Sequence, residues 1–381
     1  MINVSNLIVY LCFGVLLAPK NVSEGLYVFM SLIGLVLFFK RMDAFGVFVF
    51  FVSLCTALLV ILSIPDAISY FLLLVESKII VFPFAAFLFS RLDLSSIRFC
   101  RESVINGLLI INAIALILSG MRFRYIDFVN IDASLSIYMG VTLAAAYLMT
   151  SSQLKRLFLL FFIALSGSGT ALASLIVGVF FANREHLLTK WSFRTISILV
   201  LLVFLVIGFF YYNLIFRSRS VFDLESLDRF QLMSAGLYFV VNNFDIFDYI
   251  IGYGVARDLL GIYSYFSDTA TVLPWLIGSR ASEGFTGLVF HNEYYRVFYN
   301  FGLLGLVAFF YILYQVTRHQ KGLFAVVLAA SFFTSTIYIT SVIVFLLLFG
   351  AYGRSSQLML SCRELAGISS ESQSYLMRSP S

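Results

Sequence analysis

Long apolar stretches recur along this chain, separated by short polar segments. Hydrophobic residues make up 61% of the 381 positions and charged residues 12%, whereas soluble domains carry roughly 25% charged residues. Lipid offers the backbone no hydrogen-bond partner, so stretches of this length are expected to cross a bilayer as helices. We therefore predict an all-α integral membrane protein, a single polytopic domain over 1–381 with about 12 transmembrane helices, some of them short enough to need tilt or local bilayer thinning. The predicted segments are 5–18, 25–39, 44–64, 67–90, 103–119, 133–150, 157–165, 169–182, 195–215, 294–316, 322–336 and 338–352.

Basic residues mark one set of connections between these segments and predict the orientation of the chain. Lys and Arg are retained on the cytoplasmic side of a membrane. The short connections on the opposite side hold only Lys20, Arg122 and Arg124. We expect both termini in the cytoplasm, 216–293 as a large extracytoplasmic (periplasmic) loop, and 354–381 as a disordered cytoplasmic tail. The basic residues assigned to the cytoplasm are Lys40, Arg41, Arg91, Arg98, Arg101, Lys155, Arg156, Arg184, Lys190, Arg194, Arg318 and Lys321.

Residues 157–182 form an apolar segment with basic residues beyond both of its ends, interrupted by the sequence Ser166-Gly167-Ser168-Gly169. A single crossing would leave one basic group outside, so we predict two short helices that meet at this turn. Glycines free the backbone there, and serine hydroxyls can satisfy its exposed polar groups, as irregular backbone at membrane depth requires. One kinked helix over the same residues is the alternative.

Two charged residues, Glu76 and Lys78, lie inside the apolar segment 67–90. A charge near the bilayer centre costs about 3 kcal/mol on insertion scales, so such residues normally find polar partners. Positions two apart point to different sides of a helix, so each is expected to meet a different neighbour. Either these residues help to line a polar cavity, with Ser166 and Ser168 as further candidates, or they form structural ion pairs.

The extracytoplasmic loop contains five arginines and no lysine. The planar fork of arginine binds phosphate oxygens through two hydrogen bonds and stays protonated, whereas lysine offers a point charge. The loop therefore suits a diphosphate ligand. Acidic residues are also frequent in it, so some arginines are expected to pair with them instead. The five arginines are Arg217, Arg219, Arg229, Arg257 and Arg280.

Three further patterns stand in and after this loop. Residues 228–241 begin with Asp-Arg and continue as an amphipathic helical pattern. Gly252-x-Gly254 lacks the strand-turn-helix setting of a nucleotide fingerprint, so it is expected to permit a tight turn close to a ligand or to another helix. His291 and Asn292 then open an apolar helix.

Histidine and cysteine offer no metal or redox site. The four cysteines are scattered without a CxxC spacing, and two of the three histidines lie in segments predicted to be cytoplasmic. The basic residues stand at helix ends rather than on one soluble face. We therefore expect no bound metal, no cofactor and no nucleic-acid partner.

The order of these motifs resembles the family of bacterial O-antigen polymerases and O-antigen ligases, membrane glycosyltransferases that act on undecaprenyl-diphosphate-linked glycans. The resemblance covers roughly 157–316 and is most specific where His291-Asn292 is followed nine residues later by Gly302-Leu303-Leu304-Gly305. The Ser-rich turn, Arg229 and Gly252-Tyr253-Gly254 contribute more weakly. Family members often carry a basic residue in the Ser-rich turn, where this chain has Gly169, so another arginine must take that place here.

The resemblance implies transfer of a glycan from undecaprenyl diphosphate in the bacterial inner membrane, without nucleotide or metal. His291, with an unperturbed pKa near 6.5, can accept the proton of the acceptor hydroxyl, and arginines such as Arg229 can stabilise charge on the departing diphosphate. Alternatively, His291 and Asn292 cap the following helix, with Glu293, Tyr294 or Tyr295 as base or sugar contact. The residues expected to bind diphosphate or sugar are Arg217, Arg257, Arg280, Arg296, Arg122, Asn292, Tyr253, Gly252 and Gly254.

The identity of the acceptor separates the functions that remain. A polymerase transfers glycan to another lipid-linked repeat unit and is the first expectation, because the Ser-rich turn lacks its basic residue and the loop lacks lysines to grip a phosphorylated core. A ligase transfers the polymer to lipid A core. A transporter or flippase would use charged cavity residues such as Glu76 and Lys78, but transporters usually show internal repeats and this chain shows none. A chain-length regulator and a flippase are the expected protein partners.

Overall fold

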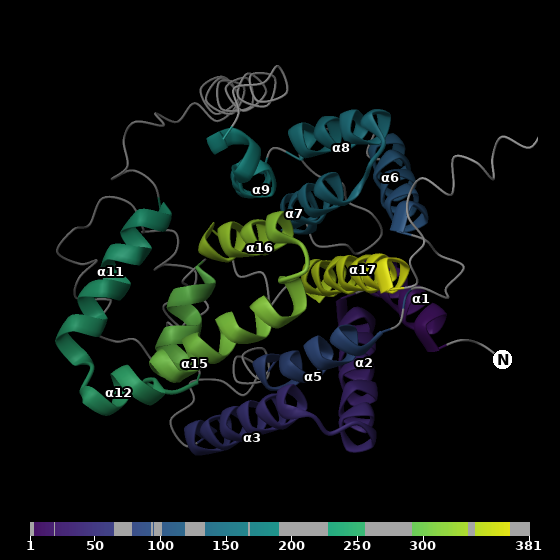
Figure 1. Ribbon diagram of the computed structural model, residues 1–381. Helices are drawn as coiled ribbons and strands as arrows, with labels where there is room; N and C mark the ends of the chain where they lie inside the picture. Colours follow the sequence, from purple (N-terminus) through teal and green to yellow (C-terminus); the bar gives the residue numbers. More distant parts are fainter. Residues whose placement is uncertain are drawn as a thin grey trace, which may run out of the picture.

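The computed structural model describes residues 4–18, 20–64, 78–92, 94, 101–118, 134–166, 168–189, 228–255, 292–333 and 340–365. Every regular element in these ranges is a helix, which confirms the all-α prediction for this part of the chain (Figure 1). The helices are α1 (Val4–Leu17), α2 (Lys20–Lys40), α3 (Ala44–Ser63), α5 (Lys78–Arg91), α6 (Arg101–Leu118), α7 (Ser134–Met149), α8 (Gln153–Leu165), α9 (Gly169–Thr189), α11 (Asp228–Asn243), α12 (Ile246–Ile251), α15 (Glu293–Thr317), α16 (Lys321–Phe333) and α17 (Thr340–Leu365).

Three helices in the described ranges are long and apolar enough to cross a membrane: Val22–Lys40 within α2, α3 and α15. Shorter apolar helices accompany them. The helices follow the apolar segments of the sequence, as where the predicted segment 44–64 becomes α3. These features support insertion of the protein into a membrane, whereas the number of crossings stays a prediction, and the predicted segment 195–215 lies outside the described residues. The shorter apolar helices are Ser5–Leu17, Met139–Met149, Gly169–Arg184, Gly322–Phe332 and Val342–Ser355.

The segment 157–182 forms two helices, as predicted from its Ser-Gly turn. Helix α8 ends at Leu165 and α9 begins at Gly169. The Ser166 hydroxyl donates to the Ile163 carbonyl at 2.7 Å and accepts from the Ser168 N–H at 3.3 Å, while Ser168 Oγ accepts from the Ala171 N–H at 3.2 Å. The two serines therefore satisfy backbone groups of the turn, and the single kinked helix is excluded.

Helix α17 lies at the centre of the bundle. Its residues from 342 to 353 are all buried, and it packs against α1, α2, α5, α7, α15 and α16 (Figure 1). The helix continues to Leu365, so 354–365 is helical and the predicted disordered tail from 354 is corrected over these residues. The hydrophobic pattern missed this extension because it is polar, and only its attachment to the apolar part of α17 makes it continue the helix.

Glycines allow α9 and α16 to approach closely. A Cβ on Gly178 would lie 2.5 Å from Cγ2 of Val326, and a Cβ on Gly322 would lie 3.0 Å from the carbonyl oxygen of Gly178. Small residues at such crossings let helix backbones pack in a bilayer, where hydrophobic association gives no driving force. This contact joins α9, the helix that follows the Ser-rich turn, to α16, the helix that follows α15.

Lys78 pairs with Glu24 of α2 across a distance of 2.6 Å. Lys78 is the first residue of α5, and it was expected to pair with a residue on another helix, as it does with Glu24. The structural ion pair is thus formed for Lys78. Glu76 lies outside the described residues, so its predicted role in a polar cavity stays a prediction.

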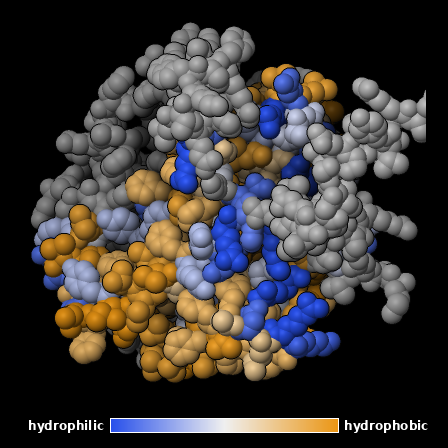
Figure 2. Space-filling model, viewed as in Figure 1, coloured by the Kyte–Doolittle hydropathy of each residue, from blue (hydrophilic) through white to orange (hydrophobic). Residues whose placement is uncertain are grey.

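Helix ends that carry basic residues meet at one place. Arg41, Arg318 and Arg354 lie close enough to Arg91 to interact with it electrostatically, and Arg91 also pairs with Asp43. All four arginines were assigned to the same side of the membrane by the charge pattern. Figure 2 shows hydrophilic side chains over the region where α5, α15 and α17 meet, with hydrophobic surface over α3 and α12. These four arginines therefore lie together in the structure, and the membrane topology stays a prediction.

Candidate functional site

The candidate site begins where Asn292 caps α15. Its side-chain oxygen accepts hydrogen bonds from the backbone N–H groups of Tyr294 at 2.9 Å and Tyr295 at 3.2 Å. Asparagine is among the preferred residues at this position because it satisfies N–H groups that lack a partner within the helix. The capping role considered for the His291-Asn292 pair therefore belongs to Asn292, whereas His291 lies outside the described residues.

A buried polar face follows along the first turns of α15. Glu293, Arg296 and Asn300 are exposed by only 0%, 1% and 0%. Their spacing of three and four residues puts them on one side of the helix, and we call these three residues the polar face. Moving ions out of water costs several kcal/mol each, so charged residues buried in a membrane helix mark either a structural pair or a functional site.

Helix α15 is interrupted just beyond the polar face, at Gly302. This residue has φ +61° and ψ −161°, a backbone region that is essentially restricted to glycine. Near the interruption, the Tyr299 carbonyl accepts a hydrogen bond of 2.8 Å from the Tyr253 N–H. A loop residue thus supplies a partner to the backbone of α15, as irregular backbone in a membrane protein requires.

Gly252 and Gly302 bring two backbones into direct contact. A Cβ on Gly252 would lie 2.4 Å from the carbonyl oxygen of Asn300, and a Cβ on Gly302 would lie 2.4 Å from that of Ile250. Real Cβ atoms do not approach so closely, so each position accommodates only glycine without a shift. The Gly252-x-Gly254 turn therefore packs against another helix, which was one of the two interpretations of this motif.

Aromatic rings fix the same turn to α15. The Tyr253 ring stacks on Phe244 with a centroid separation of 5.7 Å and also lies 5.5 Å from the rings of Phe239 and Tyr299. The Tyr253 ring is therefore packed within this cluster, and its predicted contact with a sugar stays a prediction. The cluster holds α11 and α12 beside the polar face.

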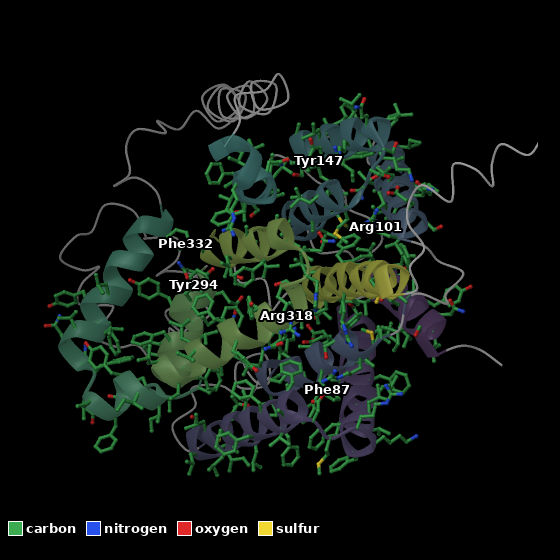
Figure 3. All side chains as sticks on the ribbon, in the orientation of Figure 1. Phe87, Arg101, Tyr147, Tyr294, Arg318 and Phe332 are labelled. Atoms are coloured by element: carbon green, nitrogen blue, oxygen red, sulfur yellow. The ribbon has the colours of Figure 1, made fainter. Side chains whose placement is uncertain are left out.

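Tyr294 connects the start of α15 to α16. Its hydroxyl donates to the Leu328 carbonyl at 2.5 Å, and its ring lies near Phe310 and Phe332, with centroid separations of 5.1 and 6.3 Å (Figure 3). A hydroxyl engaged in this way positions the helix. The Tyr294 hydroxyl is therefore engaged within the protein, and Glu293, Tyr294 and Tyr295 stay predicted alternatives to His291 as the base.

The structure describes only some of the other predicted site residues. Arg229 lies in the first turn of α11, the helix predicted for 228–241, but nothing is described of its side chain. Arg296 belongs to the polar face, and Gly254 adopts φ +116° in the turn beside it. The hydrogen bonds of Ser166 and Ser168 stay within their own turn. The predicted residues outside the described ranges are His291, Arg122, Arg217, Arg257, Arg280 and Glu76.

Asn300 was not predicted as a member of the site. The signal is present in the sequence, because Asn292, Arg296 and Asn300 recur every fourth residue in an otherwise apolar helix. A polar stripe with this period in a membrane helix indicates a side turned away from lipid.

The polar face combines a carboxylate, a guanidinium and a carboxamide. The guanidinium fork matches two phosphate oxygens, and the carboxylate can pair with it or accept a proton. Among the described residues, His, Cys, Asp and Glu form no group of three that could hold a metal ion. The described groups therefore suit recognition of an anion followed by proton transfer.

Comparison with known proteins does not show a family for this chain. No protein-family model matches the sequence, and no curated protein matches it at a significant level.

Proposed function

We propose that this protein is a membrane glycosyltransferase of the bacterial inner membrane that transfers a glycan from undecaprenyl diphosphate. The acceptor is a lipid-linked oligosaccharide repeat unit, so that the enzyme is an O-antigen polymerase building a surface polysaccharide. The proposal includes about 12 membrane crossings with both termini in the cytoplasm and the reaction at the periplasmic face. A chain-length regulator and a flippase would be its partners.

The polar face of α15 is the observation that best supports the proposal. Arg296 is a fully buried arginine next to a buried carboxylate, at the start of a helix long enough to cross a membrane. The diphosphate of a polyprenyl-linked glycan lies at the membrane surface, where the start of such a helix also lies. An arginine at this position meets the phosphate while the prenyl chain stays among apolar helices.

The reaction needs one bond made and one broken. The acceptor hydroxyl attacks the anomeric carbon, and the bond between that carbon and the diphosphate oxygen breaks. His291, or Glu293 as the alternative, takes the proton of the hydroxyl. Arg296, with Arg229 and other arginines of the loop, stabilises the charge that develops on undecaprenyl diphosphate, a contribution worth about 10²–10³ in rate for one well-placed donor.

An O-antigen ligase remains the second candidate, because it uses the same donor and the same leaving group with lipid A core as acceptor. The absence of lysine from the loop favours the polymerase. A flippase or transporter is less well supported, since Lys78 is already paired with Glu24 and the proposed site is concentrated on one helix.

Complementation of a deletion strain tests the proposal. Lipopolysaccharide from the deletion should show core capped by a single repeat unit, and the wild-type gene should restore a ladder. At matched membrane abundance, His291→Ala and Arg296→Ala should fail to restore it. Bare core in the deletion would contradict a polymerase, and accumulation of long lipid-linked polymer in that case would indicate the ligase.

A matched arginine variant controls for loss of a positive charge in general. Arg156 donates hydrogen bonds to the Thr150 carbonyl at 2.8 and 3.1 Å and lies over the ring of Tyr147. Arg156→Ala removes an arginine that holds backbone far along the chain from α15, so it should restore the ladder. A ladder with Arg296→Ala, or none with Arg156→Ala at normal abundance, would count against the assigned role of the polar face.

A further inference from the structure

Helix α12 exposes an unusual concentration of apolar side chains for a segment of a polar loop. None of its residues is buried, and Ile246, Phe247, Ile250 and Ile251 are exposed by 70%, 67%, 43% and 42%. Burial of one such side chain is worth about 1.5–3 kcal/mol. Four of them within six residues therefore favour contact with an apolar medium over contact with water.

Polar groups gather at only one end of α12. Asp245 caps the helix and forms a reciprocal capping box with Asp248, and Asn242 and Asn243 precede it. The other end consists of the isoleucine pair followed by the glycine turn. The first half of α12 thus combines the carboxylates of Asp245 and Asp248 with Ile246 and Phe247, whereas its last two residues are apolar, which suits a segment at the boundary between headgroups and acyl chains.

The apolar end of α12 lies at membrane depth along α15. It contacts α15 at Gly302, and sixteen positions separate Gly302 from Arg318, which is exposed at the basic end of the helix. At about 1.5 Å per residue this is roughly 24 Å, compared with a hydrocarbon core about 30 Å thick. When Arg318 lies at one boundary of the hydrocarbon core, the end of α12 lies within the core, near its opposite boundary.

The exposed surface of α12 continues the apolar surface of two membrane helices. Leu303 and Leu304 follow directly after Gly302 and are exposed by 54% and 60%. The Val255 N–H donates to Ser63 Oγ at 2.9 Å, which joins the turn after α12 to the last residue of α3. Figure 2 shows hydrophobic surface over both α12 and α3. On α3, the exposed apolar residues nearest to Ser63 are Leu58, Ile61 and Leu62.

We propose that α12 is embedded in the bilayer, in the leaflet at the start of α15, with Ile246, Phe247, Ile250 and Ile251 among the lipid acyl chains. Lipid is the occupant of this surface because the surface is continuous with the exposed faces of α3 and α15, two helices with the length and composition of membrane spans. The segment 216–293 is therefore not a uniformly aqueous loop. The proposal needs only a membrane protein and does not depend on the glycosyltransferase activity.

Spin labels at single cysteines test the depth of α12. The background replaces Cys12 by Ala and the other three cysteines by Ser, and the protein is reconstituted in phosphatidylethanolamine/phosphatidylglycerol vesicles. Labels go at Phe247→Cys and Ile250→Cys, with Leu58→Cys as the lipid control and Ser151→Cys as the aqueous control, because Ser151 is exposed in the connection between α7 and α8. Collision with oxygen relative to a water-soluble nickel complex should match that at Leu58 and exceed that at Ser151 severalfold.

Two results would overturn the proposal. Labels at Phe247 and Ile250 that behave like Ser151 would place α12 in water, and labels that reach neither oxygen nor nickel would place it against protein, such as a second copy. The unmodified protein gives a second measurement that needs no substitution. A diazirine carried on lipid chains should label 246–251, and hydroxyl radicals in the water should spare it; the reverse pattern would refute membrane embedding.

Discussion

Gly302→Ala is expected to destabilise the protein through two separable effects. Backbone with φ +61° and ψ −161° costs a non-glycine residue about 1–3 kcal/mol. The new Cβ would also lie 2.4 Å from the Ile250 carbonyl oxygen and 2.6 Å from the Gly252 nitrogen, and relief of such overpacking costs about 1–3 kcal/mol more. The sum is about 2–6 kcal/mol, which predicts a fall in Tm of about 2–8 °C for a chain of this length.

The buried Cys12 thiol provides the assay. Its side chain is 0% exposed, so in protein whose other three cysteines are replaced by Ser a thiol-reactive fluorophore reports unfolding as the detergent-solubilised protein is heated. Gly25→Ala is the matched control, because a Cβ there would meet nothing within 4 Å and alanine is favoured over glycine in a helix by about 1 kcal/mol. A Tm for Gly302→Ala equal to that for Gly25→Ala would refute the direct backbone contact between the Gly252 turn and α15.

Three further substitutions test contacts at the ends of the helices. Asn292→Ala should lower stability by about 0.5–2 kcal/mol through loss of the cap, whereas Asn292→Ser should retain most of it; equal Tm values for the two variants would contradict the capping role. Tyr294→Phe removes the hydrogen bond to the Leu328 carbonyl, which is still able to accept the helical N–H bond within α16, so the cost should be about 0.5–1.5 kcal/mol; an unchanged Tm would count against this contact. In a double-mutant cycle, Lys78→Ala and Glu24→Ala should show a coupling of about 0.5–3 kcal/mol, and additive effects would show that the 2.6 Å pair contributes nothing.

The sequence predicted helices well where hydrophobicity and turn chemistry agree. The break between α8 and α9 follows from glycine and serine in an apolar run, and Ser166 and Ser168 satisfy the backbone as expected. The extension of α17 to Leu365 was missed because polar composition was taken as the end of the helix. A helix already anchored by a buried apolar half can continue beyond it, and hydropathy carries no signal for that.

The candidate site was predicted less completely because its assembly depends on contacts that are distant in sequence. Gly252 and Gly302 are each conspicuous, but only the structure shows that they fit against each other. The packing of the Tyr253 ring against Phe244 also joins residues that the sequence offers no reason to pair, and the predicted sugar contact of Tyr253 stays a prediction. Arg296 was predicted as a phosphate ligand. It is buried on the same helix face as Glu293 and Asn300, which makes it the described arginine that best suits the candidate site.

Direct assay of the purified protein tests the central claim. The protein is reconstituted in vesicles with an undecaprenyl-diphosphate-linked repeat unit, in a buffer with chelator and without nucleotide, and products are measured by mass spectrometry. We predict that lipid-linked glycans of two or more repeats appear together with free undecaprenyl diphosphate, and that Arg296→Ala slows their formation by about 10²–10³ while Arg156→Ala does not. Donor that stays intact with the folded wild-type protein, both with the repeat unit alone and with lipid A core added, would contradict the proposed transfer.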